Sequence, residues 1–191
     1  DQVLKFSQKE LAPFAEEADW KGEFCWPAWK KMGAFGLLGL IYPEEYGGSG
    51  AGVVTACLAG EAVGRGGGEG GLCLAWGAHT YLCGDTILKH GSEEQKRKYL
   101  PQLASGEWVG AFGLTEPGAG SDAASIRTTA TRKGDIYLLN GTKMFITNGV
   151  HGDLIFTAAK AGDAGRNHTL SMFAIEKGMP GFKVARALKK T

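Results

Sequence analysis

The chain has 191 residues, of which 43% are hydrophobic and 21% charged, and its formal net charge is +1. This composition is ordinary for a soluble protein with one or two domains and a substantial core. Proteins that bind nucleic acid or membrane surfaces typically have an excess of positive charge, and this sequence lacks such an excess. The sequence contains no apolar stretch long enough to cross a membrane and no signal-peptide pattern, so we expect neither membrane insertion nor secretion.

Neither the four cysteines nor the four histidines form a pattern with ligand spacing. The cysteines lie in apolar surroundings without a C-x-x-C pair, which favours buried, reduced thiols in a reducing compartment: Cys25, Cys57, Cys73 and Cys83. The histidines are scattered, and none lies at ligand spacing from another histidine or from a cysteine. We therefore expect no disulfide framework and no metal site.

The N-terminal third of the sequence predicts two helices followed by a long connection. On the first helix, four apolar residues fall on one face with charges between them: Leu4, Leu11, Ala15 and Ala18. Pro27 suits the first turn of the second helix and Gly36 suits its end, because proline is preorganised for a first turn and glycine favours helix C-termini. Residues 36–52 then predict an irregular connection.

A glycine-rich run separates the next two predicted helices. Residues 53–63 are apolar enough for a buried helix. The run at 64–71 should interrupt this helix, because glycine costs about 1 kcal/mol per helical position relative to alanine. Within the run we expect Glu69 to be solvated. Residues 72–90 predict a second, more buried helix that ends at Gly91.

The last helix of this half is expected to be short. Ser92 and Gln95 have the spacing of a capping box, in which each of the two side chains binds a backbone N–H group at the helix start. The helix should continue to Tyr99, and Pro101 should end it, because proline lacks a backbone donor. We place the end of the helical N-terminal domain at residue 106.

The remaining residues, 107–191, predict an antiparallel β domain. Alternation at 126–130 predicts a strand. A hairpin is predicted over 137–147 with Asn140-Gly141 as its turn, because these two residue types tolerate the positive φ of a tight turn. Further strands are predicted at 154–159, 169–175 and 182–187.

The predicted fold class is therefore α+β with two domains: an all-α domain, 1–106, and then a barrel-like or sandwich β domain, 107–191. Five or so strands with no closing element form a small open sheet. Since open sheet edges are usually covered, we expect the chain to be part of a larger protein.

The loop GLTEPGAGSD, Gly113 to Asp122, stands at the end of an apolar run. It lacks the lysine of a phosphate-binding P-loop, the βαβ context of a dinucleotide-binding fold and the G-x-S-x-G pattern of a nucleophile elbow. Two interpretations stay open: a surface loop, or a site for a flat aromatic cofactor. Such a site needs close approach to backbone N–H groups, hydroxyls and flat apolar walls. Thr115 and Ser121 offer hydroxyls, and Phe112 and the segment 145–147 offer walls.

Two stretches together resemble the paired signature of the acyl-CoA dehydrogenases: LTEPGAGSD, and YLLNGTKMFITNG at 137–149. The resemblance covers the whole chain. GLLGLIYPEEYGGSG resembles part of the family's N-terminal helical domain, HGSEEQKRKYLPQLASGE the stretch leading into its β domain, and MFAIEKGMPGF a late strand of that domain. Several long motifs in the same order are far more specific than a single glycine motif.

The resemblance implies an enzyme in which FAD takes a hydride from the β-carbon of an acyl-CoA thioester while a glutamate removes an α-proton, giving a trans-2-enoyl thioester. Electrons would then pass to an electron-transfer flavoprotein. A homotetramer acting in β-oxidation of fatty acids is implied too. It would work in the cytoplasm of a bacterium or archaeon, or in the mitochondrial matrix of a eukaryote.

The resemblance also implies which residues contact FAD. Thr115 would lie by the redox-active edge of the flavin, Thr147 would serve from the opposite segment, and Ser121 would lie near both FAD and the thioester of the substrate. The full set of implied contacts is Phe112, Leu114, Thr115, Gly120, Ser121, Phe145, Ile146 and Thr147.

Two features depart from the family pattern. Phe145 stands where the family often has tryptophan, which keeps a flat wall but loses the indole N–H. The family's C-terminal helical domain, which carries the catalytic glutamate, has no counterpart in this chain, so we expect a fold truncated before that bundle. No residue here inherits the role of the base. Glu116 lies in the loop, but a carboxylate that structures the loop by hydrogen bonds is the better interpretation.

Two other functions stay open. An acyl-CoA oxidase would hand the electrons to oxygen, and the short, compact N-terminal region favours a dehydrogenase over it. A catalytically inactive relative would serve as a binding or assembly module, and the absence of the base favours this reading if the natural protein is no longer than this chain.

Overall fold

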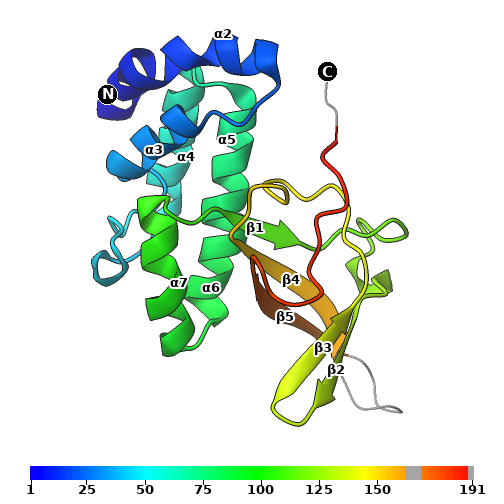
Figure 1. Ribbon diagram of the computed structural model, residues 1–191. Helices are drawn as coiled ribbons and strands as arrows, with labels where there is room; N and C mark the ends of the chain where they lie inside the picture. Colours follow the sequence, from blue (N-terminus) through cyan, green and yellow to red (C-terminus); the bar gives the residue numbers. More distant parts are fainter. Residues whose placement is uncertain (162–168, 189–191) are drawn as a thin grey trace. The chain divides into compact units, whose positions relative to one another are not determined.

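The computed structural model describes residues 1–161 and 169–188 (Figure 1). The chain divides into two compact units: a helical unit that ends at Gly110 and a β unit that begins at Ala111. The expected succession of a helical domain and a sheet domain is confirmed.

The helical unit is built from helices that follow one another with few long connections. Their bounds are α1 (Gln2–Phe6), α2 (Ala12–Lys21), α3 (Trp26–Ala34), α4 (Val53–Arg65), α5 (Gly70–Gly77), α6 (Asp85–His90) and α7 (Glu93–Ser105). Wider π-helical turns join α1 to α2 at Ser7–Leu11 and α5 to α6 at Ala78–Gly84, and a 3-10 turn lies at Glu44–Tyr46. The glycine run separates α4 from α5, as predicted.

The capping box that starts α7 is present as predicted. The Ser92 hydroxyl accepts from the Gln95 backbone N–H at 3.2 Å, and the Gln95 side chain accepts from the Ser92 N–H at 2.9 Å. The predicted end of this helix was wrong, because Pro101 lies inside α7. Leu100 and Leu103 are fully buried. Burying two such side chains stabilises by roughly 1.5–3 kcal/mol each, which together offsets a cost of about 3 kcal/mol for an internal proline.

Glu69 does more than lie in solvent, which corrects the expectation from the sequence. Its carboxylate accepts hydrogen bonds from the backbone N–H groups of Gly71 and Leu72, at 2.5 and 2.7 Å. A carboxylate in this position satisfies free donors and meets the positive end of the helix dipole. Glu69 therefore allows α5 to begin inside a glycine run.

Hydrogen bonds as well as apolar packing stabilise the core of the helical unit. It gathers the buried side chains of Trp29, Met32, Leu37, Leu38, Val63, Leu72, Trp76 and Val109. The Trp76 indole N–H donates to the Leu37 carbonyl at 3.0 Å, and the Thr80 hydroxyl donates to the Leu38 carbonyl at 2.7 Å. These bonds hold the connection after α3 against the helical run 70–90.

His79 ties the end of α7 to the start of the first strand. Its Nε2 lies 2.9 Å from the Leu103 carbonyl oxygen, and its Nδ1 accepts from the Gly110 N–H at 2.8 Å. A neutral ring with its proton on Nε2 satisfies both partners. Burial lowers the pKa of His79 to about 4, against a smaller opposing effect of the Leu103 carbonyl, so the ring is neutral at pH 7.

The four cysteines, all within the described residues, lie outside any disulfide bond, but they are not all buried as predicted. Cys83 is buried and Cys25 and Cys73 are half-buried, whereas Cys57 is exposed. Cys57 lies on α4, which buries only the face carrying Ala56, Ala59 and Val63. The sequence predicted a buried helix at 53–63 from its apolar composition, but within the described residues only one face of α4 is buried.

In the described part of the chain, the β unit has one five-stranded sheet in the order β1-β4-β2-β3, with β5 also paired to β4. The strands are β1 (Gly110–Gly113), β2 (Thr129–Lys133), β3 (Ile136–Asn140), β4 (Leu154–Ala161) and β5 (Thr169–Glu176). β5 runs antiparallel along the whole of β4, so β1 and β2 share the other edge of β4. This central place explains why residues 154–159 are all buried.

The sheet is mixed. β2–β3 and β4–β5 are antiparallel, but β2 meets β4 in parallel over two residue pairs, Thr129 with Lys160 and Ala130 with Ala161. The strands predicted at 154–159 and 169–175 are confirmed, and the one predicted at 126–130 begins at Thr129. Residues 182–187 were predicted as a strand and lie outside any strand.

The predicted hairpin at Asn140-Gly141 was also wrong. The hairpin joins β2 to β3, and its tight turn holds Gly134 at φ +62°. Gly141 serves a different purpose, because a Cβ there would lie 2.7 Å from the Cα of Thr128 and closer still to its hydroxyl. The glycine at 141 thus permits close approach of two chain segments, and residues 142–147 form a loop instead of a strand.

Candidate functional site

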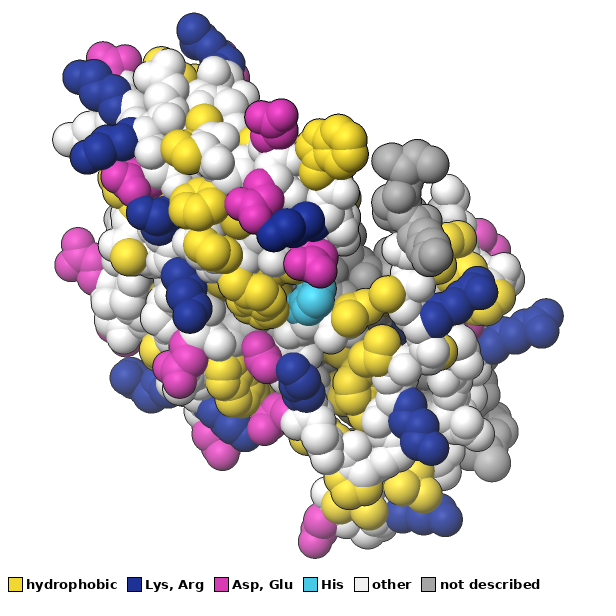
Figure 2. Space-filling model, turned by 45° about the horizontal axis from the view of Figure 1, so that its top comes forward, with side chains coloured by type: hydrophobic (Ala, Val, Ile, Leu, Met, Phe, Trp, Pro, Cys, Tyr) yellow, Lys and Arg dark blue, Asp and Glu magenta, His cyan; other side chains and the backbone are white. Residues whose placement is uncertain are grey.

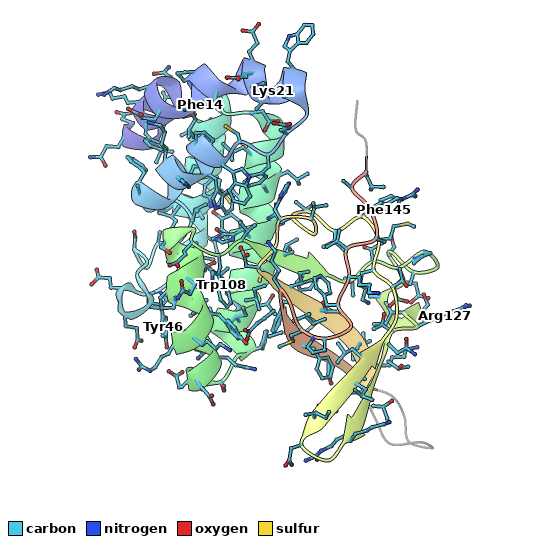
Figure 3. The ribbon with its side chains drawn as sticks, viewed as in Figure 1. Phe14, Lys21, Tyr46, Trp108, Arg127 and Phe145 are labelled. Carbon is cyan, nitrogen blue, oxygen red and sulfur yellow. The ribbon has the colours of Figure 1, made fainter. Side chains whose placement is uncertain are left out.

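Two segments that the sequence singled out lie side by side in the β unit. The Met144 N–H donates to the Thr115 carbonyl oxygen at 2.8 Å. The Lys143 ammonium group donates to the Leu114 carbonyl oxygen at 3.0 Å. The chain just after β1 is therefore paired with the loop between β3 and β4, where Phe145 follows (Figure 3).

Glu116 lies at the centre of this pairing and is buried, with 8% of the residue exposed. One carboxylate oxygen accepts from the Arg127 N–H at 2.6 Å. The other accepts from the Thr128 N–H at 3.0 Å, the Thr128 hydroxyl at 2.5 Å and the Lys143 ammonium group at 2.7 Å. Two other chain segments thus converge on the Glu116 side chain. The interpretation of Glu116 as a structural carboxylate agrees with these four bonds.

Glu116 stays ionised despite its burial. Desolvation is the largest single influence and raises its pKa, but the hydrogen bonds from Lys143, from the Thr128 hydroxyl and from two backbone N–H groups together lower that pKa to about 2. Charge-assisted hydrogen bonds of this kind are among the strongest in proteins. The carboxylate is therefore a fixed anion at neutral pH.

A tight turn follows Glu116. The Glu116 N–H donates to the Ala119 carbonyl at 2.9 Å, and the Ala119 N–H donates back at 3.2 Å. Ala119 is buried in a small cluster with Ile126 and Ala158. Beyond this anchored turn the loop is exposed at Gly120 and Ser121, and a Cβ added at Gly120 would meet no atom within 4 Å.

The second segment contains backbone conformations that are unusual for residues with side chains. Phe145 has φ +58° and Asn148 has φ +64°. Asparagine tolerates this left-handed region, but for a bulky residue it is rare and costs roughly 1–2 kcal/mol. Phe145 is nevertheless 65% exposed. A strained backbone therefore presents an aromatic ring to the outside, and such strain concentrates at functional sites.

The structure brings together some of the predicted site residues and leaves others apart. Leu114 and Thr115 are half-buried beside the second segment, where Ile146 and Thr147 are also half-buried. Phe112 is half-buried within β1. Gly120 and Ser121 are exposed, and the described bonds between the two segments do not include them.

Lys143 was missed by sequence analysis. It stands in a predicted strand of alternating side chains, where a lysine is ordinarily a solvated residue, and its carboxylate partner lies 27 residues away. Its side chain is only 12% exposed. No local pattern signals such a buried pair, because the pairing depends on how two distant loops meet.

Two recesses accompany these elements within their own units. One in the β unit, of about 260 Å³, is lined by Glu116, Pro117, Gly118, Arg127, Thr128, Gly141 and Thr142. A larger one in the helical unit, of about 500 Å³, is lined by Trp26, Trp29, Lys30, Gly33, Ala34, Ser105, Gly106 and Glu107 and contains none of the predicted site residues. Since ligand pockets usually measure about 300–1,000 Å³, this recess of the β unit is smaller than the usual enclosure for a large cofactor.

The residues present fit one side of a flavin. The exposed ring of Phe145 supplies a flat wall, Thr115 supplies a hydroxyl in the adjoining segment, and the exposed backbone at Gly118 and Gly120 can be approached closely. These are the features that a flat ring system with polar edges requires.

Two further features are absent from the described residues. Within 1–161 and 169–188 no three His, Cys, Asp or Glu side chains are grouped to hold a metal ion. No helix in those ranges has the length and apolarity needed to span a membrane. Figure 2 shows basic and acidic side chains interspersed on the face that it displays.

Comparison with known proteins agrees with the arrangement of units. The family model for the acyl-CoA dehydrogenase N-terminal domain matches residues 1–107, and the model for the acyl-CoA dehydrogenase middle domain matches residues 111–191. An acyl-CoA dehydrogenase of Bacillus subtilis is 49% identical over 189 residues, which cover 98% of this chain and 49% of that protein.

Solved structures give the same result. One described as an electron transferring flavoprotein of Acidaminococcus fermentans has a TM-score of 0.91 at 43% identity, covering 98% of this chain and 49% of that one. The FAD complex of PigA has a TM-score of 0.93 at 33% identity, covering 99% and 49%. The chain spans about half the length of the relatives it matches. With two domain models matching in order over nearly all its residues, the chain belongs to the acyl-CoA dehydrogenase family.

Proposed function

We propose that the protein containing this chain catalyses FAD-dependent α,β-dehydrogenation of acyl-CoA thioesters to trans-2-enoyl-CoA and passes the electrons to an electron-transfer flavoprotein. The observation that carries the proposal is the hydrogen bond between Met144 and Thr115, which joins the two motif segments of the family resemblance. Family membership and the relative known as an FAD complex support it. Assembly as a homotetramer is part of the same proposal.

In this proposal the chain binds and orients FAD, and FAD supplies the hydride acceptor. The Thr115 hydroxyl and nearby backbone N–H groups face the edge of the ring that gains negative charge, which stabilises the transition state. Phe112 and Phe145 supply flat walls that exclude water. Thr147 binds from the second segment, and Ser121 orients the thioester.

Glu116 is not the base in this proposal. A general base needs a pKa near the operating pH and access to the proton that it removes. Glu116 has a pKa of about 2 and is already bound by four donors. We therefore propose that the base comes from outside the described residues.

The proposal is tested on the full natural polypeptide, which should bind FAD and show its yellow absorption band. Anaerobic mixing with a series of acyl-CoA thioesters should bleach that band. Thr115→Val keeps the shape of the side chain and removes the hydroxyl, so flavin reduction should slow on the order of 100-fold or more. Thr131→Val, at an exposed position on β2, is the matched control and should reduce at the wild-type rate.

Three outcomes would contradict parts of the proposal. A protein that takes up no FAD contradicts the function itself. An unchanged reduction rate in Thr115→Val contradicts the role of that hydroxyl. Rapid reoxidation by oxygen, with no transfer to an electron-transfer flavoprotein, identifies an oxidase instead.

A further inference from the structure

Lys143 and Glu116 form an ion pair that is more buried than any other one described in the β unit. Their side chains are 12% and 6% exposed, and the Lys143 nitrogen lies 2.7 Å from the carboxylate. The other described ion pair of this unit, between Lys177 and Asp153, has side chains 61% and 28% exposed and a distance of 3.6 Å. The two pairs therefore offer a matched contrast within one unit.

The Lys143 ammonium group binds both chain neighbours of Thr115. It donates to the carbonyl oxygen of Leu114, the residue before Thr115, and to the carboxylate of Glu116, the residue after it. The next residue in the loop, Met144, donates to the carbonyl of Thr115 itself. Three consecutive residues of one segment are thus bound by two consecutive residues of the other, which fixes the register between the segments.

Stability alone is a weak explanation for this pair. A buried ion pair often stabilises a fold no better than apolar side chains of similar volume, because both charges lose their hydration. What an apolar pair lacks is direction: one ammonium group can bind a carbonyl and a carboxylate at set distances and angles. The arrangement therefore suits a device that sets geometry.

Phe145, the next residue after Lys143 and Met144, has a strained backbone conformation. Its φ of +58° follows directly after the two anchored residues, and the residue is 65% exposed, so burial of the ring does not explain the strain. On the other side the turn at Asn148 closes with a bond from the Gly149 N–H to the Ile146 carbonyl at 2.9 Å. The conformation of Phe145 is thus imposed by anchors at both ends of a short segment.

We propose that Lys143 and Glu116 act as a positioning pair, which holds Thr115 and Phe145 in one fixed arrangement against the flavin ring. The proposal rests on the proposed flavin function. Neither side chain touches the reacting atoms: Lys143 acts through the backbone of Leu114 and Met144, and Glu116 acts through Lys143 and the chain at Arg127 and Thr128.

The test uses the full natural polypeptide with FAD and four variants. Lys143→Met removes the ammonium group and keeps most of the volume. Lys143→Arg keeps the charge but carries a planar fork that cannot bind the same two acceptors in the same way. Lys143→Met with Glu116→Gln removes both charges together. Lys177→Met is the control for loss of an exposed lysine in the same unit.

Four quantities are measured: the FAD dissociation constant, the absorption spectrum of bound FAD, its midpoint potential and the rate of its reduction by an acyl-CoA thioester. For Lys143→Met we expect weaker FAD binding, a changed spectrum and potential, and reduction slower on the order of 100-fold, the effect of a misplacement of about 1 Å. Lys143→Arg should lie between this variant and the wild type. Lys177→Met should match the wild type in all four.

A purely structural pair would give a different result. Its loss would lower the thermal midpoint but leave the spectrum and potential of bound FAD unchanged, and this outcome in Lys143→Met overturns the proposal. If Lys143→Met does not fold, the same measurements are made on the double variant and on Lys143→Arg. An unchanged spectrum and potential of bound FAD in these two variants overturns the proposal. A wild-type protein that binds no FAD overturns the proposed function and this inference together. A wild-type protein that binds FAD, with an unchanged spectrum and potential of bound FAD in Lys143→Met, overturns the inference alone.

Discussion

His79 in the helical unit and Glu116 in the β unit are both buried, and each joins chain segments that are distant in sequence. His79 is neutral and binds one carbonyl and one N–H group. Glu116 is ionised and binds four donors, one of them a lysine. The difference lies in the partners: two neutral backbone groups leave a buried ring uncharged, whereas converging donors keep a buried carboxylate charged.

This contrast suggests different purposes for the two groups. His79 completes the hydrogen bonding of backbone groups in the core of the helical unit. Glu116 lies one residue from Thr115 and holds the loops of the candidate site. The predictions that follow test whether the two units respond separately when each group is disturbed.

The largest effect is expected for His79→Leu. The leucine removes the hydrogen bond to the Gly110 N–H and one of the two bonds to the Leu103 carbonyl, which keeps the bond from the Gly106 N–H at 3.1 Å. Losing the first bond should cost about 1–3 kcal/mol and losing the second about 1 kcal/mol, so the total should be roughly 3 kcal/mol. Hydrogen exchange at amides of α7 and β1 should accelerate accordingly, while amides of β2 and β3 keep their wild-type rates. His90→Leu, at an exposed position, should change exchange little. Equal acceleration in both units would contradict their independence.

The second prediction concerns acid. The pKa of His79 is about 4 in the folded protein and 6.5 in the unfolded chain, so the unfolded chain takes up the proton first as pH falls. The stability due to the neutral ring is complete above pH 6.5 and is lost between pH 6.5 and 4, by roughly 3 kcal/mol. Hydrogen exchange in the helical unit should show this loss. A variant without His79 should not show it, and a wild-type profile that is flat over this range contradicts the buried neutral ring.

How far the sequence predicted these two groups is instructive. Helix ends were largely predictable, because a capping box at Ser92 or a glycine at Gly36 acts through neighbours in the chain. The buried run 154–159 was predictable from composition. Neither His79 nor Lys143 had a partner that its own neighbourhood could reveal, since their partners lie 24 or more residues away.

The wrong predictions share a physical cause. Asn140-Gly141 has the residues of a tight turn, but at 141 the glycine accommodates Thr128 from another segment. Pro101 has the chemistry of a helix stop, but buried leucines outweigh it. In both cases tertiary contact overrode a sound local preference. In the motif at 113–122 the exposed glycines were predictable because they act within the loop itself, whereas the partners of its acid lie in two other segments.

A smaller effect of acid is expected in the β unit. The pKa of Glu116 is lowered from 4.5 to about 2, so the stability due to its carboxylate is complete above pH 4.5 and is lost as pH falls toward 2. Above pH 3 only part of this loss is reached. Amides around Arg127 and Thr128 should therefore keep their protection at pH 5, where the helical unit is already weakened. Loss of protection there between pH 6.5 and 5 would show that Glu116 is not the fixed anion described.

The smallest effect tests whether the helical unit is limited by helix propensity or by its buried polar ties. Gly64 lies near the end of α4 with no atom within 4 Å of an added Cβ, so Gly64→Ala should stabilise α4 by about 0.5–1 kcal/mol. Gly66, two residues on, differs: an added Cβ would lie 2.7 Å from the Ser7 hydroxyl and closer to its Cβ. That hydroxyl is buried and donates to the Val63 carbonyl at 2.8 Å. Gly66→Ala should therefore accelerate hydrogen exchange in α4, because the added methyl group displaces Ser7 and weakens its hydrogen bond to Val63. If both alanine variants stabilise α4 equally, helix propensity determines the stability of α4. The buried hydrogen bond of Ser7 would then contribute little, unlike those of His79.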